Sequence, residues 1–396
     1  MPPQVEVKPL LSLAIGAQAI CRRSRAEAIG FSKVPLLLPV DVDQLELDLL
    51  MSRLCFVGSR VVRTTAWILD VTRANDWWQY KLPTLLGVAY LTAFARGDTF
   101  AEYGPAFLKV ILLLIPVASY VCVINDITDE AQDRAAGKRN RLAGVPVWLK
   151  LALLIGCLLT GIAVAWLVSD HRIVVGLYAL NWLAFTLYSV APFRLKVRGF
   201  WGILADASGG QLLPSLWTMA IVAGPTQPLP WPLVAAVGGW AFALGLRSIL
   251  FHQMSDFEAD QHSGVKTCAI QLGCKGVVRW TKWVLFPLEV ACLFATLWRV
   301  GYAPAVVLLG IDLVLQWLLV RYLQFEIVLV APKPRCRPAL MKYYQLLFPL
   351  TFALALAGNS PAAWILIPLQ LMLFPEAWRR GWQHLRSMRH VIITAG

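Results

Sequence analysis

Residues 107–134 read FLKVILLLIPVASYVCVINDITDEAQDR, and they carry the clearest structural signal in the chain. The first part of this stretch is almost continuously apolar, and the segment 105–125 is long enough for one membrane-crossing helix, which needs about 20 residues. Its second part is polar and carries the acids Asp126, Asp129, Glu130 and Asp133. The stretch therefore predicts a membrane helix that ends in a group of carboxylates at the membrane surface.

The whole chain has the composition of a polytopic membrane protein. Of its 396 residues, 58% are hydrophobic and 15% are charged, whereas soluble domains carry about 25% charged residues. A soluble protein with so few charges could not cover its surface, and the composition also excludes a disordered, fibrous or disulfide-stapled secreted chain. We therefore predict an all-α fold, a bundle of membrane-spanning helices.

Apolar segments recur along the chain and predict nine or ten spans. The tenth depends on the segment Pro361–Phe374, which is short and contains proline. The expected spans lie near 82–98, 105–125, 147–168, 173–191, 202–222, 232–254, 280–298, 303–324, 342–358 and 361–376.

Residues 1–75 carry no spanning signal, and we interpret them as an N-terminal extension ahead of a transmembrane domain at 76–396. Within the extension, residues 49–69 place Arg53, Arg60 and Arg63 on one helical face and apolar side chains on the rest. This pattern is typical of an amphipathic helix that lies in the membrane interface. A soluble helix packed on the loops is the alternative.

Basic residues gather in alternate loops. The chain has 36 Lys and Arg against 23 Asp and Glu, a net charge of +13. The surplus lies in the N-terminal stretch and after the second, fourth, sixth and eighth expected spans, while the opposite loops hold Arg96, Arg172 and Arg299. The positive-inside rule places the basic loops and the N-terminus on the cytoplasmic-type side. Topology thus explains the charge, and we expect no nucleic-acid partner.

Two acidic clusters end the second and sixth spans on this basic side. They are NDITDEAQDR, with Asn125, Asp126, Asp129 and Asp133, and DFEAD, with Asp256, Glu258 and Asp260. Side chains four residues apart share a helical face, so each cluster directs carboxylates one way. Like charges held together at a membrane surface indicate a cation site, and oxygen-only donors favour Mg²⁺. Solvation of helix ends is the alternative reading.

The placement of the clusters also bears on architecture. Asn125 and Asp256 are 131 positions apart, and each cluster follows the second span of a four-span set. We therefore expect two pseudo-repeated halves that face each other around a central cavity.

Both motifs resemble signatures of the UbiA-type intramembrane prenyltransferase superfamily. NDITDEAQDR resembles its NDxxDxxxD motif, and DFEAD resembles its second DxxxD motif. Asn140-Arg141 falls where relatives often have Arg-Pro, and Leu142 replaces that proline here. Further matches are Tyr188-Ser189, Pro192 and Lys196 between the fourth and fifth spans, and Gly264, Lys266, Thr267, Leu272 and Gly273 after DFEAD. The resemblance covers about 80–396.

The resemblance implies a Mg²⁺-dependent enzyme that binds an isoprenyl diphosphate in a cavity open to membrane lipid. The implied Mg²⁺ ligands are Asn125, Asp129 and Asp133 at one site and Asp256 and Asp260 at the other, and the four aspartates are the implied catalytic residues. The other candidate substrate contacts are Asp126, Lys138, Arg141, Tyr188, Ser189, Lys196, Arg247 and Gln253. Arg247 lies inside the sixth span, where a structural pair with an acid such as Asp206 is the alternative.

The implied chemistry is ionisation of an allylic diphosphate, followed by prenyl transfer to a lipophilic or aromatic acceptor. A UbiA-type terpene cyclase would use the same diphosphate apparatus without an external acceptor, so the motifs leave both activities open. A transporter is a third possible class. The ionisable groups of a transport path lie deep in the membrane, whereas the acids of both clusters lie at the ends of spans.

Overall fold

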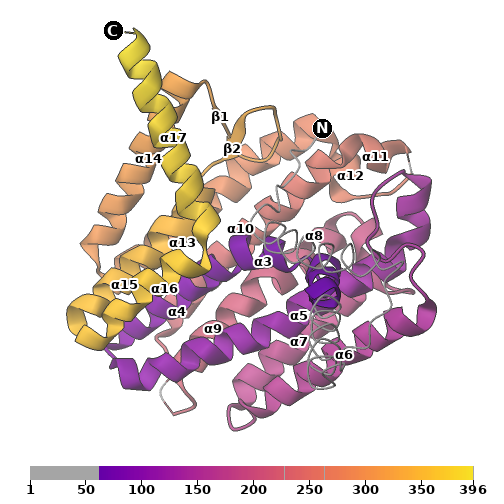
Figure 1. Ribbon diagram of the computed structural model, residues 1–396, viewed down its shortest axis with the longest axis horizontal. Helices are drawn as coiled ribbons and strands as arrows, with labels where there is room; N and C mark the ends of the chain where they lie inside the picture. The colour runs from indigo at the N-terminus through magenta and orange to yellow at the C-terminus, as the bar shows by residue number, and fades with distance from the viewer. Residues whose placement is uncertain (1–61, 227, 263, 396) are drawn as a thin grey trace, which may run out of the picture. The chain divides into compact units, whose positions relative to one another are not determined.

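The computed structural model describes residues 62–395 apart from positions 227 and 263, and most of the described chain is helical (Figure 1). The helices are α3 (Ala74–Tyr80), α4 (Leu82–Arg96), α5 (Phe100–Ala135), α6 (Val147–Trp166), α7 (Arg172–Ser189), α8 (Phe200–Ala207), α9 (Leu213–Ala223), α10 (Trp231–Ser255), α11 (Phe257–His262), α12 (Cys268–Trp280), α13 (Phe286–Val300), α14 (Ala303–Leu323), α15 (Phe348–Asn359), α16 (Leu366–Leu373) and α17 (Pro375–Ala395). Short 3₁₀ or π-helical segments are η1 (Leu195–Val197), η2 (Ser208–Leu212), η3 (Thr281–Leu285), η4 (Tyr343–Leu347) and η5 (Pro361–Ile365). The strands β1 (Glu326–Val328) and β2 (Cys336–Pro338) pair in parallel within one loop.

The chain divides into the units Met1–Leu69 and Asp70–Gly396, and the second holds all the labelled elements. Residues 62–71 are helical. The rest of the amphipathic helix predicted over 49–69 lies outside the described residues. That helix and the 75/76 domain boundary therefore stay predictions.

Several helices of the second unit are apolar and long enough to cross a membrane. They are α5, α6, α10, the continuous segment Cys268–Val300 and α14. Pro361–Leu373 is a shorter apolar helix. These helices confirm the all-α class, while the count of nine or ten spans and the pseudo-repeat of two halves stay predictions.

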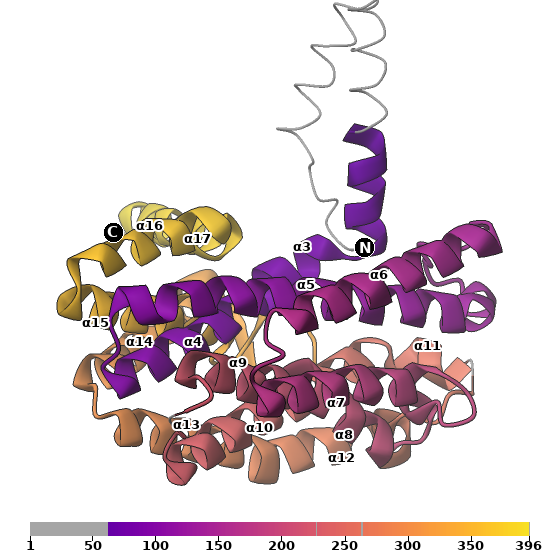
Figure 2. The same cartoon turned by 90° about the horizontal axis from the view of Figure 1, so that it is seen from below.

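Two layers of helices bring the site together. Figure 2 shows α5 and α6 above α7, α10 and α12. The main core joins α4, α9, α10 and α15 through large buried side chains such as Trp217, Trp240 and Phe348. The aromatic rings of Trp240 and Phe348 lie 5.1 Å apart, centroid to centroid.

The first acidic motif lies on an unbroken helix. A capping box starts α5, in which the Glu102 side chain accepts the Thr99 backbone N–H at 2.6 Å. The helix then runs for 36 residues and ends at Ala135, beyond the acids. Asn125, Asp129 and Asp133 therefore do share one helical face.

The second motif differs from the expectation of one helical face. Helix α10 ends at Ser255, Asp256 caps it, and α11 begins at Phe257. The Asp260 N–H still donates to the Asp256 carbonyl at 2.9 Å, so one turn links the two acids across the break. Asp256 is exposed, whereas Asp260 is buried.

Gly245 allows α10 to pack closely against α8. A Cβ on Gly245 of α10 would lie 2.9 Å from Ala207 Cα of α8, closer than real contacts allow. Small residues permit such backbone approach between membrane helices. The contact keeps α10, which carries the second motif at its end, against α8.

Candidate active site

Asp129 is the centre of the first group of charges. Its Oδ1 lies 2.5 Å from Lys196 Nζ and 3.0 Å from Arg194 Nη2. Both cations come from the segment between α7 and α8. Arg194 also donates to the Thr128 carbonyl at 3.3 Å and to the Gln132 side chain at 2.9 Å. The end of α5 is thus neutralised by basic side chains from a distant part of the sequence.

The backbone around Lys196 is fixed by close packing. A Cβ on Gly202 would lie 2.6 Å from the Leu195 carbonyl oxygen, so only glycine lets the η1 turn rest on α8. The Gly199 N–H donates to the Lys266 carbonyl at 3.0 Å and ties this segment to the loop after the second motif. Burial lowers the pKa of Lys196, while the charge of Asp129 opposes that shift.

Lys138 joins the two motifs. It follows α5, and its Nζ lies 3.0 Å from Asp256 Oδ2 and 3.2 Å from Asp260 Oδ1. Burial disfavours its charge, but the two carboxylates prevail and raise the pKa of Lys138. Burial in turn raises the pKa of Asp260, against the effect of Lys138.

Asn140 folds the loop after α5 back onto the first motif. Its Nδ2 donates to Asp133 Oδ2 at 2.9 Å and to the Asp126 carbonyl at 2.7 Å. Its Oδ1 accepts the Leu142 N–H at 3.0 Å. The hydrogen bonds set the position of the loop that carries Lys138.

Asp126 and Arg141 bind other protein groups at the edge of the site. The Asp126 carboxylate is almost fully buried, lies 2.5 Å from Arg73 Nη2 and accepts the Arg141 N–H at 3.2 Å. The Arg141 side chain extends instead to Asp70, with Nε 3.2 Å from Oδ1. In this arrangement both residues anchor the segments beside the motif.

The end of α7 contacts the first motif. Ser189 Oγ donates to Asn125 Oδ1. The neighbouring Tyr188 is partly buried and lies within electrostatic range of Asp129, Asp206 and Asp260. Ser189 therefore contacts the first motif, and Tyr188 lies near acids of both motifs.

The Arg247 side chain bonds to acceptors within the protein. Its Nε and Nη2 donate to Glu289 at 2.6 and 2.7 Å, and its remaining bonds go to the Leu329 and Ala339 carbonyls. Tyr344 Oη donates to the same glutamate at 2.8 Å. Protein acceptors thus occupy the buried guanidinium, and its ion-pair partner is Glu289 rather than Asp206. A substrate contact by Arg247 stays a prediction, and the alternative of a structural pair is the one that these contacts favour.

Gln253 also hydrogen-bonds within the protein. Its side chain is buried, and Oε1 accepts the Ala269 N–H at 3.1 Å near the start of α12. A helix begins with unpaired N–H groups, and this side chain satisfies one of them. A substrate contact by Gln253 stays a prediction.

The donor set fits Mg²⁺. No three His, Cys, Asp or Glu side chains form one cluster within the described ranges; instead, Lys or Arg side chains contact Asp129, Asp256 and Asp260. Mg²⁺ commonly takes one or two carboxylates and completes its shell with water and substrate phosphates. The motifs offer such oxygen donors on two segments that Lys138 holds together.

Four residues of the structure were not predicted. Arg194 and Arg73 bind Asp129 and Asp126, Glu289 binds Arg247, and Lys81 Nζ lies near Gly210 beside Asp206. An ion pair of Glu289 could have been predicted from the sequence, because an acid within an apolar membrane helix needs a partner. The signal for Arg194 was weaker, because it shares the η1 loop with Lys196. No local pattern distinguishes Arg73 or Lys81 from other basic residues near the membrane.

The chain is similar to several known proteins. The UbiA prenyltransferase family matches the chain over residues 82–325. A lycopene elongase/hydratase of Halobacterium salinarum is 30% identical over 213 residues, which are 52% of this chain and 71% of the relative. The enzyme of that name from Haloferax volcanii is 28% identical over 64% of this chain and 80% of its own.

A solved structure shares the fold. A UbiA homologue from Archaeoglobus fulgidus, determined bound to GPP and Mg²⁺, matches with a TM-score of 0.51 at 16% identity. The match covers 76% of this chain and 99% of that one. Together with the family match, it shows that the protein is an integral membrane, prenyltransferase-type enzyme. The chain belongs to the UbiA prenyltransferase family.

Proposed function

We propose that the chain transfers an isoprenyl group from an allylic prenyl diphosphate to a lipophilic acceptor within the membrane, with Mg²⁺ as cofactor. The observation that carries the proposal is the position of Lys138, which follows the first acidic motif and contacts both aspartates of the second. A diphosphate between the motifs would meet carboxylates for its metal ions and ammonium groups for its oxygens.

Asn125, Asp129 and Asp133 would hold Mg²⁺ on one side, and Asp256 and Asp260 on the other. The ion would supply Lewis-acid neutralisation of the diphosphate, which is otherwise a poor leaving group. The relative from Archaeoglobus fulgidus, which was solved with GPP and Mg²⁺, supports the proposal that Mg²⁺ and a prenyl diphosphate bind together.

The basic side chains would bind the diphosphate directly. Lys138, Lys196 and Arg194 now contact carboxylates, and diphosphate oxygens offer them alternative acceptors of higher charge. Such preorganised cations stabilise the charge that develops on a leaving group. As the allylic C–O bond breaks, its electron pair leaves with the diphosphate and an allylic cation remains. Tyr188 and Ser189 would orient the substrate from α7.

The proposed acceptor is an apolar polyene, because the two curated relatives are named lycopene elongase/hydratase. A double bond of the acceptor would attack the allylic cation and form the new C–C bond. The positive charge then lies on the acceptor, and it is removed by loss of a proton or by addition of water with loss of a proton. We also propose that the motifs and the N-terminus face the cytoplasmic-type side, as the distribution of basic residues suggests.

The test uses the purified full-length chain in lipid with dimethylallyl or geranyl diphosphate and Mg²⁺. Lycopene is supplied in one arm, a carboxylated aromatic compound in a second and no acceptor in a third. We expect prenylated lycopene in the first arm. A product confined to the aromatic arm would overturn the polyene assignment, and a cyclic terpene formed without acceptor would establish the cyclase instead.

Matched variants test the site. Asp129→Asn and Asp256→Asn should each abolish product formation, whereas Glu258→Gln, an exposed acid between the second-motif aspartates, should retain it. Full activity in both aspartate variants would refute the proposed diphosphate site.

A further inference from the structure

The C-terminal helix α17 is strongly amphipathic. Trp378, Trp382, Leu385 and Met388 recur at spacings of three or four residues and so lie on one helical face. The other face carries Arg379, Arg380 and Arg386. A helix with large apolar side chains on one face and arginines on the other is typical of the membrane interface.

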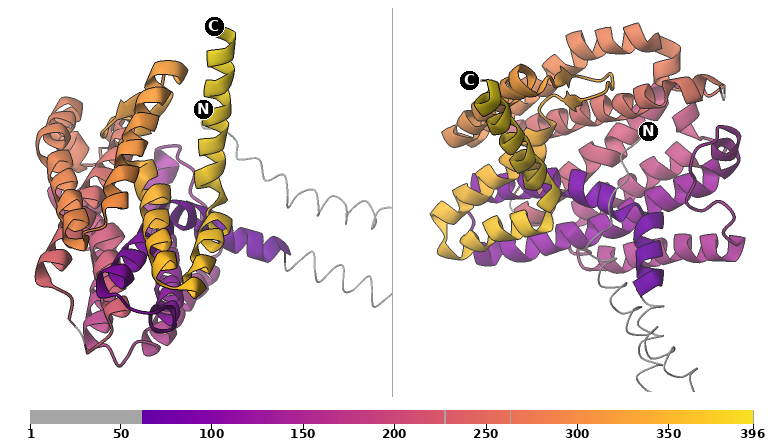
Figure 3. Two further views of the ribbon diagram at one scale, coloured as in Figure 1. Left: turned by 90° about the vertical axis from the view of Figure 1, so that its left-hand side faces the viewer. Right: turned by 45° about the horizontal axis from the view of Figure 1, so that its top comes forward.

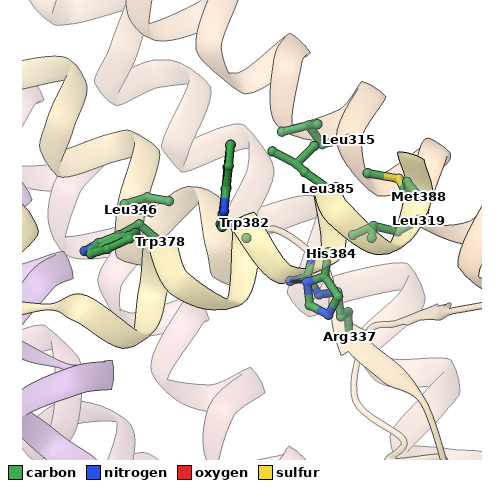
Figure 4. Close-up of a pocket in the computed structure, with 10 residues that line it drawn as sticks. Leu315, Leu319, Arg337, Leu346, Trp378, Trp382, His384, Leu385 and Met388 are labelled. Carbon is green, nitrogen blue, oxygen red and sulfur yellow. Dashed lines mark hydrogen bonds between the residues drawn. The ribbon is translucent and has the colours of Figure 1, made fainter. Parts of the chain in front are cut away.

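Helix α17 runs beside α14 (Figure 3), and an apolar groove of about 450 Å³ lies between them. Figure 4 shows Leu315 and Leu319 of α14 near Leu385 and Met388 of α17. Trp378, Trp382 and Leu346 continue the lining. The groove is suited to a hydrocarbon chain.

Cations converge at one edge of the groove. Arg337 Nη2 lies 3.0 Å from His384 Nδ1, and both residues belong to the lining. Burial lowers the pKa of His384, and the charges of Arg337, Lys342 and Arg380 lower it further. The charges of Arg337, Lys342 and Arg380 therefore all act on one imidazole.

Nearby acids balance only part of these charges. Glu376 pairs with Arg380, and the Asp312 carboxylate accepts a hydrogen bond from Gln316 while it acts on Arg337 from a distance. The Lys342 side chain has no ion-pair or hydrogen-bond partner within the described part of the chain. The edge of the groove thus has an excess of positive charge beside an apolar surface.

We propose that this groove binds an anionic phospholipid of the surrounding bilayer, with an acyl chain between α14 and α17 and the phosphate near Arg337, Lys342 and Arg380. Basic pockets between membrane helices bind anionic lipid headgroups in this way. The neutral His384 can donate a hydrogen bond from its second ring nitrogen, since Nδ1 accepts from Arg337. The site is separate from the acidic motifs, so its occupant does not depend on the proposed reaction.

The test is native mass spectrometry of the detergent-purified full chain with added dioleoyl phosphatidylglycerol or dioleoyl phosphatidylcholine. We expect a clear preference for phosphatidylglycerol. The variant Arg337→Gln/Arg380→Gln should remove it, with a loss of about fivefold in affinity for each charge. Arg379→Gln, which removes an arginine stacked on Trp378 at 5.6 Å, should keep the preference.

A second variant probes the chain rather than the headgroup. Leu315→Trp would fill the groove and keep every cation, so it should weaken phosphatidylglycerol binding even if the double charge variant fails to fold. Equal binding of both lipids by the unaltered protein would overturn the proposal. Displacement of phosphatidylglycerol by geranyl diphosphate in the unaltered chain, but not in the charge variant, would instead identify a second diphosphate site and equally overturn it.

Discussion

Lys138 Nζ lies 3.0 Å from Asp256 Oδ2, across 118 residues of sequence. The lysine stands just beyond the helix of the first acidic motif, and the aspartate caps the helix that leads to the second. This ion pair therefore links the two motifs, and a diphosphate bound there would compete for the same ammonium group.

Loss of the Lys138 charge should impair turnover more than folding. In Lys138→Met we expect kcat/KM for the prenyl diphosphate to fall roughly 10- to 100-fold, because a hydrogen bond to a charged group contributes about 1.5–3 kcal/mol. Steady-state kinetics at saturating Mg²⁺ measure the effect. Arg139→Met is the control, since exposed Arg139 pairs with Asp70 outside the motifs. Equal losses in both variants would argue against a specific role for Lys138.

Removal of metal should abolish activity without unfolding the chain. Lys138, Lys196 and Arg194 already neutralise the carboxylates, so chelation by EDTA should leave the helical circular dichroism unchanged while product formation stops. Added Mg²⁺ should restore turnover. Undiminished turnover after exhaustive chelation would contradict the Mg²⁺ assignment.

Gly202→Ala should damage the site through the backbone. The new Cβ would lie 2.6 Å from the Leu195 carbonyl, so the turn that carries Lys196 must shift. We expect a stability loss of about 1–3 kcal/mol together with reduced turnover, measured by thermal unfolding and by product formation. Gly156→Ala is the control, since its Cβ would meet nothing within 4 Å. If Gly202→Ala retained full stability and activity, the packing argument would fail.

The Arg247–Glu289 pair should matter for stability. Arg247→Met leaves a buried carboxylate without its cation, and we expect a loss of about 3–5 kcal/mol. The double variant Arg247→Met/Glu289→Met should lose less than the two single variants together, as shown by unfolding midpoints. KM for the diphosphate should stay unchanged in the folded fraction. A raised KM for the diphosphate together with an unchanged unfolding midpoint would instead indicate that Arg247 contacts the substrate.

Much of the site was predictable because it is local. Asn125, Asp129 and Asp133 share a face through helical periodicity alone, and α5 does continue past them to Ala135. The position of Asp256 was harder to predict, since its spacing to Asp260 suits a helix but the chain breaks at Asp256. Arg247 was predicted as a substrate contact because its partner Glu289 is 42 residues away in another helix.

The amino-acid sequence was enough to predict an all-α membrane fold, two acidic motifs at helix ends and an excess of basic residues in alternate loops. These features follow from hydrophobicity, helical period and charge, which act over short stretches of chain. The tertiary structure alone decided which cation meets which carboxylate: Lys138 with the second motif, Arg194 and Lys196 with Asp129, and Arg247 with Glu289. Long basic side chains can reach several acids, and only the packing of helices such as α8 against α10 through Gly245 determines which acids lie within range.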